Sequence, residues 1–354
     1  MNKKTIPLTF RHYFALLFIL LLTTGCSTGS YGGSAPIVMG SPYNSAAAKT
    51  KNDLGLWNDG DTKKAITDYI ARITDEKSKD FIPEDQRIAV FDNDGTLWGE
   101  YPPVWGLLAQ HRIRQMVLAD TSLARREPYK SFLSEGVDYL DRASQKDVTA
   151  ILATTYTGMT QQEFNDIAKE FFATEHPTLA GSYQQNVYAP MRQLLDHLAD
   201  NGFTVYIVTG ADVQLVRAVA QEYYGIPPER VIGSSWRIMA LNGSDGMQLF
   251  RMPEVEVFTN EDVKPVMIDR HIGRMPVLAV GNDGNYGDIA MLRYAASNPL
   301  PHLCLLVTHD DAKRERAYGD RNGLSVATAQ RNNWPIISMS KDWKQIFTDP
   351  PKEK

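Results

Sequence analysis

Four short apolar runs constrain the fold of this chain more than any other feature of its sequence. They read RIAVF (87–91), FTVYIVT (203–209), PVLAV (276–280) and LCLLV (303–307). Because none shows the regular polar–apolar alternation of a half-exposed strand, each predicts a strand buried on both faces of a sheet. Between these runs, apolar side chains recur at the spacing of amphipathic helices. Strands alternating with such helices indicate βαβ units, and therefore an α/β fold with a parallel sheet.

The interval between the first two strands is long and helical in pattern. It contains the segments VWGLLAQHRIRQMVLAD, KSFLSEGVDYL, DVTAILATTY and QQEFNDIAKEFFATEH. We therefore predict a helical cap over residues 98–186, inserted into a core made of residues 53–97 and 187–350. Two apolar runs within 231–252, separated by Asp245-Gly246, predict a small β-hairpin.

The N-terminal residues 1–25 have the pattern of an export signal. Lys3, Lys4 and Arg11 precede the apolar stretch YFALLFILLL, which is too short to cross a bilayer as a mature helix. The stretch is followed by TTGC, which resembles a bacterial lipobox, so we expect Cys26 to become a lipidated N-terminus. The alternative is an ordinary cleaved signal peptide followed by a chance cysteine.

The following residues, 26–52, are rich in Gly and Ser and predict a flexible tether between a lipid anchor and a folded body. Ser27 after the cysteine resembles the pattern of lipoproteins sorted to the outer membrane. We therefore expect a protein of the bacterial cell envelope, anchored to the membrane by lipid and facing the periplasm. The formal charge is −5 and no Lys/Arg-rich run occurs, so we expect no nucleic acid as a partner.

Polar residues follow three of the predicted strands at the point where each one ends. They form the stretches DNDGT (92–96), TGAD (209–212) and GNDGNYGD (281–288). Because ligands bind beyond the carboxyl ends of parallel strands, we expect these stretches to lie together. Carboxylates at both Asp92 and Asp94, after a buried strand, are costly unless a cation or a reaction requires them.

Together with Lys264 in EDVKP, these stretches resemble the motifs of the haloacid dehalogenase superfamily of phosphohydrolases. The likeness covers roughly residues 85–345 and is greatest to the phosphoserine-phosphatase-like branch, whose helical cap also lies between the first and second motifs. It implies a doubly wound parallel sheet of the Rossmannoid kind with an inserted helical cap. It also implies that Asp92 attacks phosphorus to form an aspartyl-phosphate, while Asp94 serves as general acid and base.

The same resemblance implies the groups that bind phosphate and metal. Thr209, Gly210 and Lys264 would hold the phosphoryl oxygens. Mg²⁺ would neutralise the clustered negative charge, bound by Asp92, by Asp94 through its backbone carbonyl, and by acids after the third strand.

The third strand-end motif departs from the usual spacing of the family. Asn282 follows Gly281, and two extra residues precede Asp288. Either Asn282 or Asp283 could therefore be the direct metal ligand. We predict Asp283 and Asp288, because carboxylates bind Mg²⁺ better than an amide does.

The sequence thus predicts an enzyme, a Mg²⁺-dependent phosphatase acting on a small phosphorylated metabolite. Glu100 lies close to the position at which related phosphoserine phosphatases bind the substrate amine, and we consider it a possible substrate ligand. Dehalogenase chemistry on the same fold is an alternative, although it would not need Asp94. A non-catalytic envelope lipoprotein that only binds a ligand is another, although Asp92, Asp94 and Lys264 are all retained.

Overall fold

The computed structural model describes residues 54–179, 181–243, 246–284 and 286–348. The predicted signal peptide (1–25), Cys26 and the tether (26–52) lie outside these residues and stay predictions. Within the described part of the chain, no helix has both the length and the apolar character needed to span a membrane.

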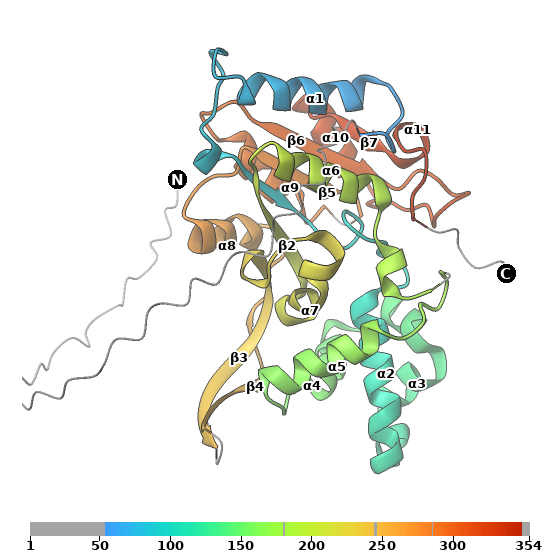
Figure 1. Cartoon of the computed structure of the whole chain (residues 1–354). Coiled ribbons are helices and arrows are strands. Elements are labelled where there is room, and N and C mark those ends of the chain that lie inside the picture. The colour runs from blue at the N-terminus through green and yellow to red at the C-terminus, as the bar shows by residue number, and fades with distance from the viewer. Residues whose placement is uncertain (1–53, 180, 244–245, 285, 349–354) are drawn as a thin grey trace, which may run out of the picture. The chain divides into compact units, whose positions relative to one another are not determined.

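The core is a seven-stranded sheet with the order β4-β3-β2-β1-β5-β6-β7 (Figure 1). Its strands are β1 (Ile88–Phe91), β2 (Thr204–Asp212), β3 (Val231–Gly243), β4 (Gly246–Val257), β5 (Leu278–Asn282), β6 (Leu303–Thr308) and β7 (Ile336–Ser338). Neighbouring strands are parallel, except that β3 and β4 form an antiparallel hairpin. The predicted α/β fold with a parallel sheet is confirmed, and so is the hairpin predicted within 231–252.

Strand β1 lies in the middle of the sheet, where the strand order reverses. Its Phe91 is in register with Ile207 of β2 on one side and with Val280 of β5 on the other. The chain continues outward from β1 through β2 and β3, and later returns to build β5, β6 and β7 on the opposite side. Because ligands of open α/β sheets bind at this reversal, the residues that follow β1 occupy the binding position.

Helices cover both faces of the sheet because the strand side chains alternate between two apolar cores. In β1, Phe91 belongs to one core and Val90 to the other. The Phe91 core includes side chains of α1 (Asp61–Thr74), α6 (Ala189–Asp200), α7 (Val213–Tyr224) and α11 (Met339–Asp342). The Val90 core includes side chains of α8 (Val263–Ile272), α9 (Ile289–Ala296) and α10 (Leu324–Arg331). This burial on two sides explains why the strands read as continuous apolar runs.

Four α-helices fall within the described part of the segment predicted as a cap, which is residues 98–186. They are α2 (Val104–Ala119), α3 (Tyr129–Glu135), α4 (Gln145–Tyr156) and α5 (Gln161–Phe172), and they group beside the projecting part of the β3–β4 hairpin (Figure 1). Helix α5 begins with a capping box in which Thr160 and Glu163 each accept the other's backbone N–H. That these helices form a separate domain stays a prediction.

A buried ion pair connects the hairpin to the helices around it. Arg251 of β4 is only 2% exposed and pairs with Asp212, which caps the start of α7. Its other nitrogens donate to the carbonyl oxygen of Tyr156 at 2.7 Å and to Oε1 of Gln161 at 2.5 Å. The guanidinium also lies 4.0 Å from the ring centroid of Phe164. One side chain therefore links β4 to α4, α5 and α7.

Candidate active site

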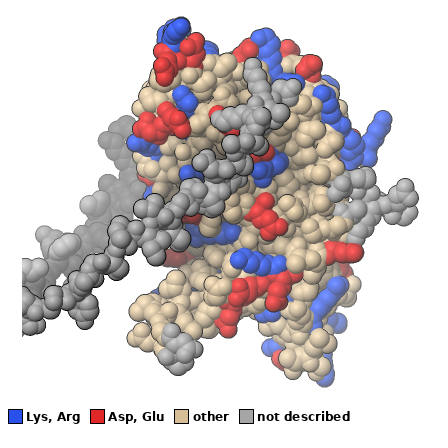
Figure 2. All heavy atoms as spheres, in the orientation of Figure 1, with Lys and Arg blue, Asp and Glu red and all other residues tan. Residues whose placement is uncertain are grey.

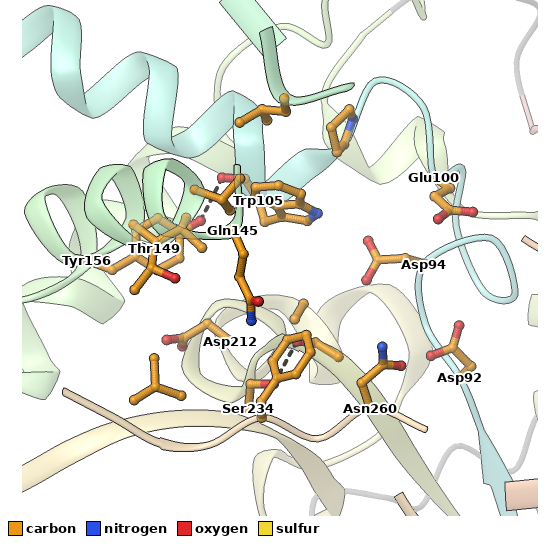
Figure 3. A pocket seen from close by; sticks show the side chains of 18 of the residues that line it. Asp92, Asp94, Glu100, Trp105, Gln145, Thr149, Tyr156, Asp212, Ser234 and Asn260 are labelled. Atoms are coloured by element: carbon orange, nitrogen blue, oxygen red, sulfur yellow. Dashed lines mark hydrogen bonds between the residues drawn. The ribbon is translucent and has the colours of Figure 1, made fainter. Parts of the chain in front are cut away.

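The stretches that follow β1, β2 and β5 meet at one cavity, as their positions in the sequence predict. Its volume is about 550 Å³. At one end lie Asp92, Asp94, Lys264, Asn282 and Asp288. In Figure 3 the side chains of Asp92, Asp94 and Glu100 gather at that end, whereas Trp105, Gln145, Thr149 and Tyr156 line the other. The cavity therefore has an acidic end at the sheet and a second end formed largely by the helices of residues 98–186.

Lys264 bridges two of the acids at the bottom of this cavity. It sits in the first turn of α8, is 2% exposed, and donates from Nζ to Oδ1 of Asp92 at 2.6 Å. The same Nζ donates to Oδ1 of Asp288 at 2.5 Å. The second oxygen of Asp288 accepts the backbone N–H of Asn282 at 2.8 Å. Asp288 therefore positions Lys264 and the end of β5, and Lys264 holds one oxygen of Asp92.

Burial and mutual repulsion change the pKa values of these groups. Burial first, and then the charge of Asp288, raise the pKa of Asp92 to about 7, although Lys264 opposes that change. Burial alone would lower the pKa of Lys264, but the carboxylates of Asp288 and Asp92 outweigh it and raise that pKa overall. The site thus concentrates more negative charge than one ammonium group neutralises, which favours the binding of a further cation.

Asp94 faces the cavity and is held by two donors. The indole Nε1 of Trp98 donates to its Oδ1 at 2.9 Å, and the hydroxyl of Thr209 lies 3.4 Å from its Oδ2. Burial raises the pKa of Asp94, and the hydrogen bond from Trp98 partly offsets this rise. Thr209 also accepts the backbone N–H of Ala211 at 3.0 Å, while Gly210 lines the cavity itself. The side chains predicted to bind phosphate are therefore beside the two aspartates.

Asn282 and Asp283, the two alternatives for the direct metal ligand, have different surroundings in the structure. The side-chain Nδ2 of Asn282 lies 2.6 Å from the carbonyl oxygen of Asp94 and 3.2 Å from Oδ2 of Asp92. Asp283 does not line the cavity, and its backbone carbonyl accepts the N–H of Asp320. Its Oδ1 is buried without a hydrogen-bond partner, and burial raises its pKa to about 6. The geometry therefore favours Asn282 over Asp283 as the neighbour of Asp92.

The oxygen atoms near Asn282 fit a hard divalent cation. A carboxylate oxygen of Asp92 and the carbonyl oxygen of Asp94 both lie within hydrogen-bond reach of one amide end. Oδ1 of Asn282 accepts the backbone N–H of Gly284 at 2.5 Å, so the amide must turn and give up that hydrogen bond before its oxygen can face the same point. Such donors suit Mg²⁺. In the described ranges no three His, Cys, Asp or Glu side chains come together around a metal position, so the carboxylate set that includes Asp283 stays a prediction.

The sequence profile of the haloacid dehalogenase-like hydrolases matches residues 89–293, more than half of the chain. The chain belongs to this family. A solved structure of a functionally unknown protein from Anaerococcus prevotii DSM 20548 is similar over 77% of this chain and 90% of that one, at 15% identity and a TM-score of 0.51. That likeness supports the fold.

Two further solved structures are similar at lower scores. A protein of unknown function from Bordetella pertussis Tohama I matches 71% of this chain and 98% of its own, at 14% identity and a TM-score of 0.48. A phosphoserine phosphohydrolase-like protein from Francisella tularensis subsp. tularensis SCHU S4 matches 68% and 98%, at 16% identity and a TM-score of 0.37. None of the curated proteins compared with this sequence matches it.

In this haloacid dehalogenase-like hydrolase, Glu100 reaches the acidic end of the cavity, as its position in the sequence suggested. Its Oε2 is buried, and a Cβ atom at Gly95 or Gly284 would come within 3.0 or 2.8 Å of it. Burial raises the pKa of Glu100 to about 8, although a hydrogen bond with Tyr318 lowers it. Because Gly95 also has a φ of 73°, a glycine is required there both for conformation and for space.

The residues that support Glu100 lie mostly in the segment that follows β6. The hydroxyl of Tyr318 lies 2.9 Å from Nε2 of His309, and Nδ1 of His309 lies 3.1 Å from a carboxylate oxygen of Glu315. The hydroxyl of Tyr188 donates to the other oxygen of Glu315 at 2.5 Å. His309, Glu315 and Tyr318 lie within one stretch of ten residues, whereas Tyr188 and Glu100 come from far earlier in the chain. Only the folded structure of the hydrolase brings this network together.

The second end of the cavity combines residues of the segment 98–186 with residues of the hairpin, and the contribution of the hairpin was not predicted. Its apolar wall consists of Trp105, Leu140 and Leu152 from residues 98–186, and of Trp236, Val255 and Phe258 from the β3–β4 hairpin and the loop after it. Phe258 remains 57% exposed and Val255 49% exposed. The hairpin was predicted as a structural element, but nothing in its sequence indicated that it would line the active site.

Proposed function

We propose that this hydrolase is a Mg²⁺-dependent phosphatase, a phosphoric monoester hydrolase, that acts on a small phosphomonoester through an aspartyl-phosphate. The observation that carries the proposal is the arrangement of Asp92. One of its oxygens is held by Lys264 at 2.6 Å, while Asp94, a second buried carboxyl group, faces the same cavity. A nucleophile and a proton donor thus stand beside one space that can hold a phosphoryl group.

Two steps follow from this arrangement. An oxygen of Asp92 forms a bond to phosphorus as the ester P–O bond breaks, and Asp94 gives its proton to the departing alcohol. A water molecule then attacks the aspartyl-phosphate and gives a proton to Asp94, which releases inorganic phosphate and restores Asp92. The raised pKa of Asp94 supports this role, because a proton donor must hold its proton near the working pH.

The positive groups of the site would stabilise the phosphoryl oxygens. Lys264 supplies one charge, and the hydroxyl of Thr209 and the backbone at Gly210 stand next to the aspartates. Asp92, the backbone carbonyl of Asp94 and Asn282 would hold Mg²⁺, which when bound neutralises the carboxylates and the phosphate dianion. Dehalogenase chemistry is less well supported, since it needs no proton donor for a leaving alcohol and therefore gives the buried carboxyl group of Asp94 no role.

The surface and the cavity favour a small substrate over a polymer. On the face seen in Figure 2, Lys and Arg alternate with Asp and Glu, and no continuous basic area covers it. The acids lie inside a cavity partly walled by the helices of residues 98–186. An intact nucleic acid would find neither phosphate-binding charge nor easy access.

The test compares the purified protein with two site variants and one control variant on p-nitrophenyl phosphate and on an alkyl phosphate, with Mg²⁺ or EDTA. We expect Asp92→Asn to abolish turnover and EDTA to suppress it reversibly, while the exposed-site control Asp120→Asn stays active. Asp94→Asn should lose about 10²–10⁴-fold in kcat on the alkyl ester and less on the nitrophenyl ester, whose leaving group needs no proton. Full activity of Asp92→Asn, or activity that persists in EDTA, would contradict the proposal.

We also propose that the hydrolase is anchored by lipid at Cys26, in the bacterial envelope and facing the periplasm. The support is the basic start, the short apolar stretch and TTGC. Cys26→Ser should block lipidation and release the protein from membrane fractions, because stable anchoring needs attached acyl chains. A Cys26→Ser protein that is processed and retained like the wild type would refute this location.

A further inference from the structure

The wall of the cavity opposite the aspartates is rich in aromatic rings. Trp105 and Trp236 contribute to it from different parts of the fold, and Phe258 adds a ring that is 57% exposed. Large apolar side chains left open beside a binding cavity mark a contact surface for a ligand. At the rim, the guanidinium of Arg316 already lies 4.3 Å from the ring centroid of Tyr101, another lining residue. The faces of aromatic rings attract cations in this way.

The charges of the lining residues exclude a second anionic group on the substrate. Six of the described lining residues are acidic, and Lys264 is the one cation among them. That cation is already bound to Asp92 and Asp288, while Asp212 is paired with Arg251. Asp141 forms no salt bridge among the described residues, and it supplies the negative charge of this end, since burial raises the pKa of Glu100 to about 8. A carboxylate or second phosphate on the leaving group would therefore enter an acidic cavity without a counter-ion, which is costly.

The same two features, aromatic rings and surplus acids, suit a leaving group that is positively charged and apolar at once. Mg²⁺ and the phosphate dianion cancel in charge, so the cavity stays negative when both are present. A neutral apolar group would pack against the rings but would gain nothing from the negative charge of the acids. A bare ammonium group would use polar lining residues such as Gln145, Thr149 and Ser234 as hydrogen-bond acceptors, but would gain little from the rings.

Resting on the proposed phosphatase activity, we infer that the alcohol released from the substrate carries an ammonium group with apolar substituents, such as trimethylammonium. This group lies against the rings of Trp105, Trp236 and Phe258, within the field of Asp141. The scissile phosphate lies at the acidic end, beside Asp92.

The test compares esters that differ in charge but match in size, using the purified full-length protein with Mg²⁺. Phosphocholine and 3,3-dimethylbutyl phosphate have the same shape, and only the first carries the positive charge. We expect kcat/KM for phosphocholine to exceed that for the neutral ester by about 10-fold, an effect between those of an exposed and of a fully desolvated cation–ring contact. O-Phosphoserine and glycerol phosphate should be poorer substrates than phosphocholine.

Two matched variants locate the effect. Asp141→Asn should lower the ratio of phosphocholine to neutral-ester kcat/KM by about threefold, as expected for an exposed charge that lines the cavity. Asp138→Asn neutralises an exposed acid of the same short helix (Gly136–Asp141) outside the cavity, and should leave that ratio unchanged. Phe258→Leu keeps an apolar side chain but removes the ring, and should lower the ratio by about threefold.

The outcomes separate this inference from the activity on which it rests. If the neutral ester or O-phosphoserine equals or exceeds phosphocholine, the inference is wrong while the phosphatase activity stands. If Asp138→Asn and Asp141→Asn change the ratio equally, the charge does not act within the cavity and the inference again fails. If no ester is hydrolysed, p-nitrophenyl phosphate included, then the proposed function fails and the inference fails with it.

Discussion

Replacing Lys264 tests the central ion pairs of the site. The substitution Lys264→Met keeps an unbranched apolar stem and removes the terminal ammonium group with its charge. In the wild type this ammonium group is 2% exposed and lies 2.6 Å from Asp92 and 2.5 Å from Asp288. The variant therefore leaves two buried carboxyl groups facing each other, with Asp94 nearby and no cation between them.

The magnitude follows from the burial of all partners. Removing one member of a buried ion pair lowers the free energy of unfolding by about 3–5 kcal/mol, because an uncompensated charge is left behind. The decrease in the free energy of unfolding should be smaller at low pH, since one of the two carboxyl groups can then take up a proton and lose its charge. Activity should fall by about 10²–10³-fold at pH 7, as for the loss of a single electrostatic contact to the transition state.

The pH dependence has a definite sign. In the wild type burial and Asp288 raise the pKa of Asp92 to about 7, and Lys264 opposes the rise. Without Lys264 this pKa rises further, so above pH 6 the folded variant holds more protons than the folded wild type. The stability difference between the two proteins therefore grows with pH, by up to about 1.4 kcal/mol per pH unit for one proton.

Urea unfolding in EDTA at pH 6 and pH 9 measures this effect, with the exposed Lys130→Met as the control. We expect Lys264→Met to show a larger deficit in the free energy of unfolding at pH 9 than at pH 6, and Lys130→Met to match the wild type at both. A deficit that is equal at the two values, or no deficit at pH 9, would refute the reasoning that Lys264 neutralises Asp92.

Three further predictions concern the metal position, the hairpin and the thiol. Asn282→Ala should raise the Mg²⁺ concentration for half-maximal activity by about 10-fold or more. Asp283→Asn, outside the cavity, should raise it less. Equal increases in the two variants would contradict the placement of Asn282, and not Asp283, beside the metal position. Arg251→Met should lower the free energy of unfolding by about 3–5 kcal/mol because it strands the buried carboxylate of Asp212, and a urea midpoint like that of the wild type would count against this. Cys304 is buried and its pKa is raised to about 12, so thiol reagents should modify it only in urea, as peptide mass mapping can establish.

Residues close together in sequence account for what could be predicted about the site. Asp92 and Asp94 follow a strand whose apolar pattern is plain, so their place at the carboxyl edge of the sheet needs no long-range information. Thr209 could be placed in the same way, at the end of the next predicted strand. Lys264 was identified by resemblance, and the 2.6 Å contact with Asp92 depends on how α8 packs under the sheet.

From the sequence we predicted Asp283 and not Asn282 as a metal ligand, whereas the folded protein places Asn282 beside Asp92. Neighbouring residues at a strand end point in different directions. In addition, the two extra residues before Asp288 mean that this stretch cannot be matched position by position to the usual spacing of the family motif. In the folded protein, Asp288 accepts the backbone N–H of Asn282 at 2.8 Å, and this contact sets which side chain turns toward Asp92.

The sequence by itself determined the layered α/β fold, because periodicity and strand composition are local properties that burial imposes on each segment. It also determined the acidic end of the site, since one strand carries both aspartates. Only the tertiary structure decided which residues form the rest of the cavity. Trp105 and Phe258 are far apart in the chain and share a wall because the β3–β4 hairpin packs beside α4 and α5. Such a contact depends on the shapes of whole elements, and no short stretch of sequence records it.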